Sequence, residues 1–125
     1  MTKIKVQTDC GNSPKMEFLK DFNTAFGTGN TKFLIDNVTD DIVWNMIGDK
    51  TIKGKENYAK TINGMKDKDV SEFIIDNVLT HGTLGAANGV VKMKNGKNYA
   101  FSDIYEFKSA SSKILKTITS YVIEI

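Results

Sequence analysis

The amino-acid sequence predicts an α+β domain in which three N-terminal helices pack on one side of a strongly curved antiparallel sheet. Apolar residues recur three times at helical spacing in the first half of the chain, and four stretches with the alternation of strands follow, joined by short turns. Helices placed ahead of a strand meander are typical of α+β architecture. At 125 residues the chain is expected to form one domain, with residues 1–12 as an N-terminal extension.

The first helix begins at a strong start signal. Ser13 is a capping residue, Pro14 suits the first helical position, and Glu17 lies in the first turn near the positive end of the helix dipole. Gly27 and Gly29 are expected to end this helix. Its predicted buried face contains Phe18, Leu19, Phe22, Ala25 and Phe26.

A short helix, a strand and a third helix are expected next. The segment 30–38, "NTKFLIDNV", predicts a short helix capped by Asn30. Residues 41–47 alternate as a strand does, and the turn-rich "GDKTIKG" follows. Helical spacing returns in "KENYAKTINGMK", where Tyr58 and Ile62 lie four residues apart.

The remaining residues predict four strands, in 71–81, 85–94, 97–108 and 113–125, and Asn95-Gly96 is a strong hairpin signal. "IKVQ" near the N-terminus is either an additional strand or a loose arm. In the last strand, Leu115, Thr117, Thr119 and Tyr121 are predicted on one face and Ile114, Ile118 and Val122 on the other. Because neither face is strongly polar, we expect a second copy of the chain to cover the outer face, which predicts a homodimer.

The composition argues against several classes of function. The net charge is +2, from 17 Lys and Arg against 15 Asp and Glu, and the lysines are scattered, so nucleic acid is not an expected partner. Cys10 and His81 are the only cysteine and histidine, which excludes an internal disulfide and gives no zinc-site spacing. We expect no metal, no cofactor and no membrane partner, and the absence of an apolar signal core predicts a cytoplasmic protein.

One carboxylate stands in an apolar pattern. In "YAFSDIYEF", alternation places Asp103 on the same strand face as Phe101, Tyr105 and Phe107. A carboxyl group in a dry pocket has a raised pKa, so Asp103 is a candidate acid or base, or a neutral hydrogen-bond donor. The alternative is structural, with the acid bonded to a cavity water, a lysine or a tyrosine hydroxyl. Both interpretations are open at this point.

Aromatic and thioether side chains from several elements are expected to converge near Asp103. A mostly apolar cavity with few polar groups is typical of small-molecule sites, and we expect it to take a small apolar or carbonyl-containing molecule. The alternative is that these side chains simply fill a core. The predicted ligand-binding residues are Phe22, Phe26, Trp44, Met46, Tyr58, Tyr105 and Tyr121.

Two segments carry a family resemblance. "FNTAFGTGNTKFLIDNVTDDIVWNMIGDKTIKGKENY" and "YAFSDIYEFKSASSKILKTITSYVI" resemble the SnoaL-like branch of the nuclear transport factor 2-like (NTF2-like) superfamily, over a stretch from about Pro14 to the C-terminus. The resemblance implies a cone-shaped α+β fold of the cystatin-like kind, whose curved sheet wraps a pocket. It also implies a frequent dimer through the outer surface of the sheet.

The resemblance implies activities that can be compared residue by residue. Ketosteroid isomerases use an Asp base with an oxyanion hole formed by a Tyr and a neutral Asp. Aligned through "GTGN" and "SDIYEF", the neutral Asp falls on Asp103, but the Tyr falls on Phe22 and the base on Met46, so this activity is not expected. Epoxide hydrolases of this fold need an Arg, and the chain has none. SnoaL-like cyclases use a pocket acid for an aldol closure, a role open to Asp103.

Three functions are therefore open to this chain. The first is a small-molecule-binding protein with an apolar pocket around Asp103. The absence of a catalytic base at the aligned position, Met46, favours this function. The second is a cofactor-free isomerase or cyclase that uses Asp103 as acid or base. The third is a protein-interaction or dimerisation domain with a filled core and no turnover, because this fold hosts many unrelated functions.

Overall fold

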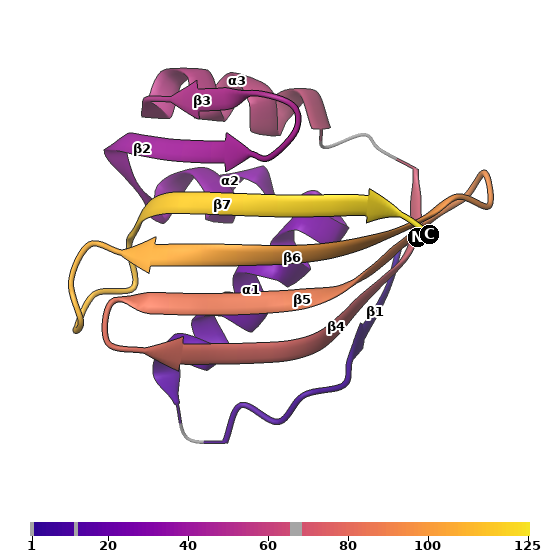
Figure 1. Ribbon diagram of the computed structural model, residues 1–125, viewed down its shortest axis with the longest axis horizontal. Coiled ribbons are helices and arrows are strands. Elements are labelled where there is room, and N and C mark those ends of the chain that lie inside the picture. Colours follow the sequence, from indigo (N-terminus) through magenta and orange to yellow (C-terminus); the bar gives the residue numbers. More distant parts are fainter. Residues whose placement is uncertain (1, 12, 66–68) are drawn as a thin grey trace.

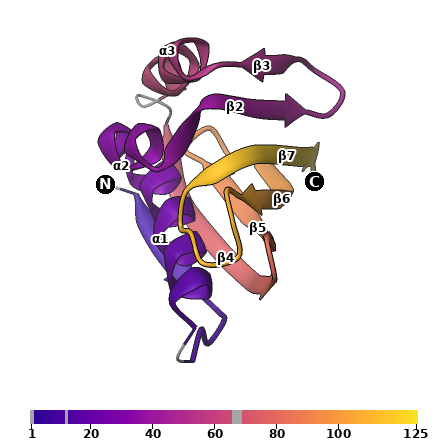
Figure 2. The same cartoon turned by 90° about the vertical axis from the view of Figure 1, so that its left-hand side faces the viewer.

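The computed structural model describes residues 2–11, 13–65 and 69–125, and these form a curved mixed sheet with helices on its concave side (Figures 1 and 2). The helices are α1 (Pro14–Thr28), α2 (Thr31–Asp36) and α3 (Lys55–Met65). The strands are β1 (Lys3–Val6), β2 (Val38–Met46), β3 (Thr51–Lys53), β4 (Val70–His81), β5 (Leu84–Met93), β6 (Asn98–Phe107) and β7 (Leu115–Glu124). Their order across the sheet is β1-β4-β5-β6-β7-β2-β3. The α+β prediction is confirmed.

The ends of α1 and α2 follow the sequence signals. The Ser13 hydroxyl accepts a hydrogen bond from the Met16 amide at 3.2 Å, and Gly29 ends α1 in the left-handed conformation with φ 74°. The Asn30 side chain accepts from the Phe33 amide, as expected of a cap. Gly27 lies inside α1 instead of ending it. A Cβ there would meet the Phe73 side chain at 3.0 Å, so this glycine allows α1 to approach β4 closely.

The sheet is antiparallel over the β4-β5-β6-β7 meander and parallel at two other pairings. β1 pairs with β4 in parallel, and β2 pairs with β7 in parallel, so the expectation of a purely antiparallel sheet was incomplete. β2 is separated from β7 by β3, α3 and the strands β4, β5 and β6, which is the long connection that a parallel pair needs. The turn-rich stretch after β2 contains the short strand β3, which pairs with β2.

The last strand has an irregularity that changes which residues face inward. Glu106 pairs with Thr117 but Phe107 pairs with Leu115, so Lys116 is an extra residue in β7. Such a bulge restarts the alternation of side chains. Leu115 and Ile118 are both buried on the concave side, and Tyr121 faces outward. The prediction that Leu115 shares a face with Tyr121 was therefore wrong, whereas Thr117, Thr119 and Tyr121 do share the face opposite to Ile118 and Val122.

The concave side of the sheet holds the core, and its convex side exposes apolar side chains. α1 packs on β4 and β5, and α3 packs on β2 (Figure 2). The exposed large apolar residues on the outer surface of the meander are Leu79, Leu84, Ile104, Tyr121 and Ile123. Among the described residues, no helix is both long and apolar enough to span a bilayer.

Candidate functional site

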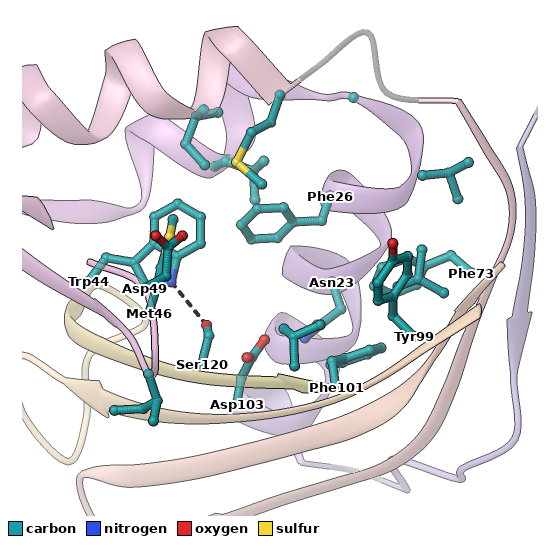
Figure 3. Close-up of a pocket in the computed structure, with 18 of the residues that line it drawn as sticks. Asn23, Phe26, Trp44, Met46, Asp49, Phe73, Tyr99, Phe101, Asp103 and Ser120 are labelled. Carbon is teal, nitrogen blue, oxygen red and sulfur yellow. Dashed lines mark hydrogen bonds between the residues drawn. The ribbon is translucent and has the colours of Figure 1, made fainter. Parts of the chain in front are cut away.

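A cavity of about 640 Å³ lies between the concave side of the sheet and the helices (Figure 3). This volume is within the range of small-molecule sites. Most of its lining is apolar, and the exposed residues Ile47, Asp49 and Val122 form its rim. The interior lining includes Asn23, Phe26, Leu34, Trp44, Met46, Ile62, Met65, Val70, Phe73, Val91, Met93, Tyr99, Phe101, Asp103 and Ser120.

Asp103 is the acidic side chain of the cavity interior. It extends from β6 toward the helices and is directly opposite Ser120 of β7 (Figure 3). Burial of the carboxyl group raises the pKa of Asp103 to about 6, and hydrogen bonds from Ser120 and Tyr105 offset part of that rise by stabilising the ionised form. At neutral pH Asp103 is therefore mostly ionised, and it becomes mostly protonated below pH 6.

A line of neutral hydrogen-bonding groups supports this carboxylate from both sides. The Trp44 Nε1–H donates to the Ser120 hydroxyl at 2.9 Å (Figure 3), which leaves the Ser120 hydrogen to donate to Asp103. On the other side, the Tyr105 hydroxyl donates to Asp103 Oδ2 at 3.1 Å. Asn23 Nδ2 donates to the Tyr105 oxygen at 3.0 Å and to the Leu19 carbonyl at 2.8 Å. Hydrogen bonds on both sides hold Asp103 in place.

The structure brings together only some of the predicted ligand-binding residues. Phe26, Trp44 and Met46 line the cavity with Asp103. The remaining four lie elsewhere. Phe22, Tyr58 and Tyr105 are 0% exposed and pack in the core behind the cavity wall, and Tyr121 is 48% exposed on the outer face of the sheet.

The three core residues support the wall. The Phe22 ring packs edge-on against Tyr105 with ring centroids 6.1 Å apart, and the Tyr58 ring packs against Trp44 at 5.8 Å. The Tyr58 hydroxyl donates to the Leu34 carbonyl at 2.9 Å, and burial raises the pKa of Tyr58. These rings fix the positions of the cavity residues without facing the cavity themselves.

Sequence reasoning missed two polar residues of the site. Asn23 is 1% exposed on the apolar face of α1, and an amide between Phe22 and Phe26 at helical spacing was a signal that could have found it. Ser120 shares its strand face with Ile118 and Val122, but the alternation alone did not show that this face, and not that of Tyr121, turns inward. The aromatic wall residues Phe73, Tyr99 and Phe101 were also outside the predicted set.

The other chemically interesting residues lie away from the cavity. His81 is exposed at the end of β4, and Cys10 is buried before α1, where burial raises the pKa of its thiol. Over residues 2–11, 13–65 and 69–125, no three His, Cys, Asp or Glu side chains gather as metal ligands would. Neither His81 nor Cys10 is among the residues that line the cavity.

Comparison of the sequence with protein-family models finds no match, and no curated protein matches it. Solved structures do match. An NTF2-like protein of unknown function from Burkholderia xenovorans LB400 is 18% identical, with a TM-score of 0.75 over 89% of this chain and 84% of that chain. A protein described as a candidate ketosteroid isomerase from Kribbella flavida DSM 17836 is 11% identical, with a TM-score of 0.74 over 89% and 78% of the two chains.

A third similar structure is an LEH-like epoxide hydrolase from M. tuberculosis, 14% identical, with a TM-score of 0.71 over 87% of this chain and 82% of that chain. At these identities the likeness concerns the fold alone. The chain therefore has the NTF2-like fold that the resemblance implied.

Proposed function

We propose that this NTF2-like chain is a SnoaL-like small-molecule-binding protein that holds a small, largely apolar ligand in the cavity, with Asp103 as the polar group that orients it. The observation that carries the proposal is a carboxylate in the wall of a mostly apolar cavity, held by hydrogen bonds from Ser120 and Tyr105. Sites of this kind combine apolar area for affinity with a few placed polar groups for orientation. An acid that served only the packing of the core would not need an apolar space in front of it.

Binding is tested by filling the cavity. Val91 lines the cavity from β5, and its neighbour Val90 faces the other side of the same strand. The wild type is expected to bind the neutral probe N-phenyl-1-naphthylamine. The fluorescence of the bound probe, excited through Trp44, should rise to saturation as the probe is added. Val91→Phe is expected to lower the affinity about tenfold or more, because the larger ring occupies the site, and Val90→Phe is the matched control. Equal binding by all three proteins would contradict the proposal.

A second candidate function is cofactor-free acid-base chemistry on a carbonyl compound. The observation that favours it is the pKa of about 6 for Asp103, which suits a general acid or base near neutral pH. The position of the isomerase base is occupied by Met46, which cannot take a proton. We therefore place binding first.

Proton exchange separates the two functions without knowledge of the natural substrate. The α-protons of 2-tetralone exchange in D₂O, and NMR measures the rate. If the chain only binds, exchange is expected at the buffer rate with wild type and with Asp103→Asn alike. Acceleration by the wild type that Asp103→Asn abolishes would instead establish acid-base catalysis.

We also propose that two copies associate through the convex face of the sheet. Leu79, Leu84, Ile104 and Tyr121 are between 41% and 65% exposed there, which is a large apolar area to leave in water. Sedimentation equilibrium is expected to give a dimer for the wild type and a monomer for Ile104→Lys. Val6→Lys, at an exposed apolar position of β1, is the control that should stay dimeric. A monomeric wild type would refute this proposal.

A further inference from the structure

The described side chains that line the cavity carry charge of one sign only. Within the part of the chain that the structure describes, the lining contains two acids, Asp103 inside and Asp49 at the rim, and no lysine. The chain as a whole has a net charge of +2, so the two acids give the described lining the opposite sign to the whole chain. The charges of this described part of the lining favour a positively charged ligand, and low-dielectric walls strengthen their effect.

Asp103 lacks a charged protein partner among the described residues. Its neighbours are Ser120 from β7, Tyr105 from β6 and, one hydrogen bond further, Asn23 from α1 and Trp44 from β2, all of which are neutral. Burial and the nearby Asp103 charge hold the pKa of Tyr105 well above its usual value, so it stays neutral too. No described lysine forms an ion pair with Asp103. A half-buried carboxylate without a counter-charge is costly, and a cation would relieve that cost.

The hydrogens nearest to Asp103 are already used. Trp44 Nε1–H donates to Ser120, and Tyr105 donates to Asp103 itself. An ionised carboxylate accepts up to about four hydrogen bonds, so Asp103 has acceptor capacity left for a ligand. The inner end of the cavity therefore offers a free acceptor and no equivalent free donor from these groups. A ligand group that brings hydrogens suits this end better than a carbonyl oxygen does.

The walls next to the carboxylate also favour a cation. Five of the described aromatic side chains line the cavity, and the ring faces of aromatic side chains attract ammonium groups. Phe101 lies two residues from Asp103 on the same face of β6. Trp44 donates a hydrogen bond to Ser120, which lies directly opposite Asp103 on β7 (Figure 3). The aromatic lining residues are Phe26, Trp44, Phe73, Tyr99 and Phe101.

We propose that the ligand of this cavity is a lipophilic amine, bound as its ammonium ion with an N–H donating to Asp103 and its hydrocarbon part against the aromatic and methionine side chains. This inference rests on the proposed binding function and narrows its ligand class. The expected ligand is then a cation and not a neutral carbonyl compound. A bound amine compensates the buried charge that no described side chain compensates.

The two ligand classes have opposite pH dependence. An ammonium ion needs the ionised carboxylate, whose pKa in the free protein is about 6. Between pH 7.5 and pH 5.0 the ionised fraction falls about tenfold, and amine affinity falls with it. A ketone that accepts a hydrogen bond from the protonated acid would instead bind more tightly at pH 5.0. Asp49, the other acid of the lining, lies at the rim.

Trp44, the only tryptophan, reports on cavity occupation through its fluorescence. Four probes share one hydrocarbon frame: 1-adamantanamine, 1-adamantanol, 2-adamantanone and 1-adamantanecarboxylate. At pH 7.5 the amine is expected to bind wild type about tenfold or more tightly than the alcohol and the ketone, as one charge-assisted hydrogen bond allows. Asp103→Asn is expected to reduce this preference to about twofold. Asp41→Asn makes the same chemical change at an exposed position of β2 and should keep the full preference.

Each other outcome is informative. If the alcohol, the ketone or the carboxylate binds as tightly as the amine, the cavity binds small molecules but the amine inference is overturned. If none of the four probes changes Trp44 emission up to millimolar concentration, the inference and the proposed binding function fail together. Should Asp103→Asn not fold, the wild type decides the matter alone, because its amine preference must fall about tenfold between pH 7.5 and pH 5.0. A preference that does not change with pH overturns the inference.

Discussion

The Tyr105 hydroxyl lies 3.1 Å from Oδ2 of Asp103, two residues away on the same face of β6, and donates its single hydrogen to that oxygen. The same hydroxyl lies 3.3 Å from Oδ1 of Asn23, which is its alternative acceptor. When Asp103 takes up a proton, the Tyr105 hydrogen is free to turn toward Asn23. The protonation of one cavity acid is thus coupled to the direction of a buried hydrogen bond.

Replacing Tyr105 by Phe is expected to raise the pKa of Asp103 above 6, because the ionised carboxylate loses a donor. The unfolding free energy is expected to fall by about 1–3 kcal/mol, since Asn23 loses a buried partner. A ¹³C NMR titration of the carboxyl carbon measures the pKa. Tyr121→Phe removes the same atom from the outer face and should leave this pKa unchanged. An unchanged value in Tyr105→Phe would mean that the hydrogen bond does not stabilise the ionised form.

Asp103 is expected to make stability fall as pH rises. Its folded-state pKa of about 6 is above the unfolded value of about 3.9, so the folded protein binds this proton more tightly. The contribution is fully present below pH 4 and is lost as the pH rises through 6. Its size is at most about 3 kcal/mol, from a difference of about two pKa units.

The measurement is urea unfolding of wild type and Asp103→Asn between pH 3.5 and 7.5. The unfolding free energy of Asp103→Asn is expected to rise by up to about 3 kcal/mol relative to that of the wild type as the pH rises, because the amide does not ionise. Asp41→Asn, at an exposed site, serves as the control. A difference between wild type and Asp103→Asn that is constant with pH would show that Asp103 titrates alike in both states.

Ser120→Ala is expected to cost about 1–3 kcal/mol of stability, since Trp44 Nε1–H, on a side chain only 4% exposed, loses its acceptor. Ser102→Ala makes the same change on the outer face of β6 and is expected to stay within about 0.5 kcal/mol of wild type. Chemical unfolding measures both variants, and the indole N–H resonance of Trp44 should move only in Ser120→Ala. Equal losses in the two variants would argue against a structural role for this bond.

Gly89→Ala is expected to destabilise the chain by more than about 2 kcal/mol, as overpacking against backbone does. A Cβ on Gly89 would lie 1.9 Å from the Ile74 carbonyl oxygen, next to the register shift between β4 and β5 at Ile75 and Asn77. Gly64→Ala is the matched control, because nothing lies within 4 Å of its Cβ position in α3. That variant should be neutral or more stable by up to about 1 kcal/mol. Thermal unfolding of both proteins checks the contrast.

The sequence predicted the elements well where local signals decide them. Ser13 and Asn30 mark helix starts, and the alternation from Phe101 to Phe107 holds throughout β6. The parallel pairings of β1 and β2 were not predictable from their own residues, because they depend on how distant segments meet.

The site was predicted less completely than the fold. Asp103, Phe26, Trp44 and Met46 do meet in one cavity. Periodicity shows that a side chain faces inward but not whether it meets a ring or an empty space, and for this reason Phe22, Tyr58 and Tyr105 were not separated from the cavity wall. Tyr121 was misplaced because one extra residue in β7 reverses the alternation beyond it.

The two outermost strands of the sheet restrict how this protein can meet its own copies. β1 covers the side of β4 with a strand of four residues that carries Lys3 and Lys5, and β3, at the opposite border, has three residues. Short edge strands with charged side chains are poor templates for pairing with a strand of another molecule, so sheets do not readily extend from one molecule into the next. This arrangement guards against fibrous aggregation while the broad convex surface stays free for an ordered contact.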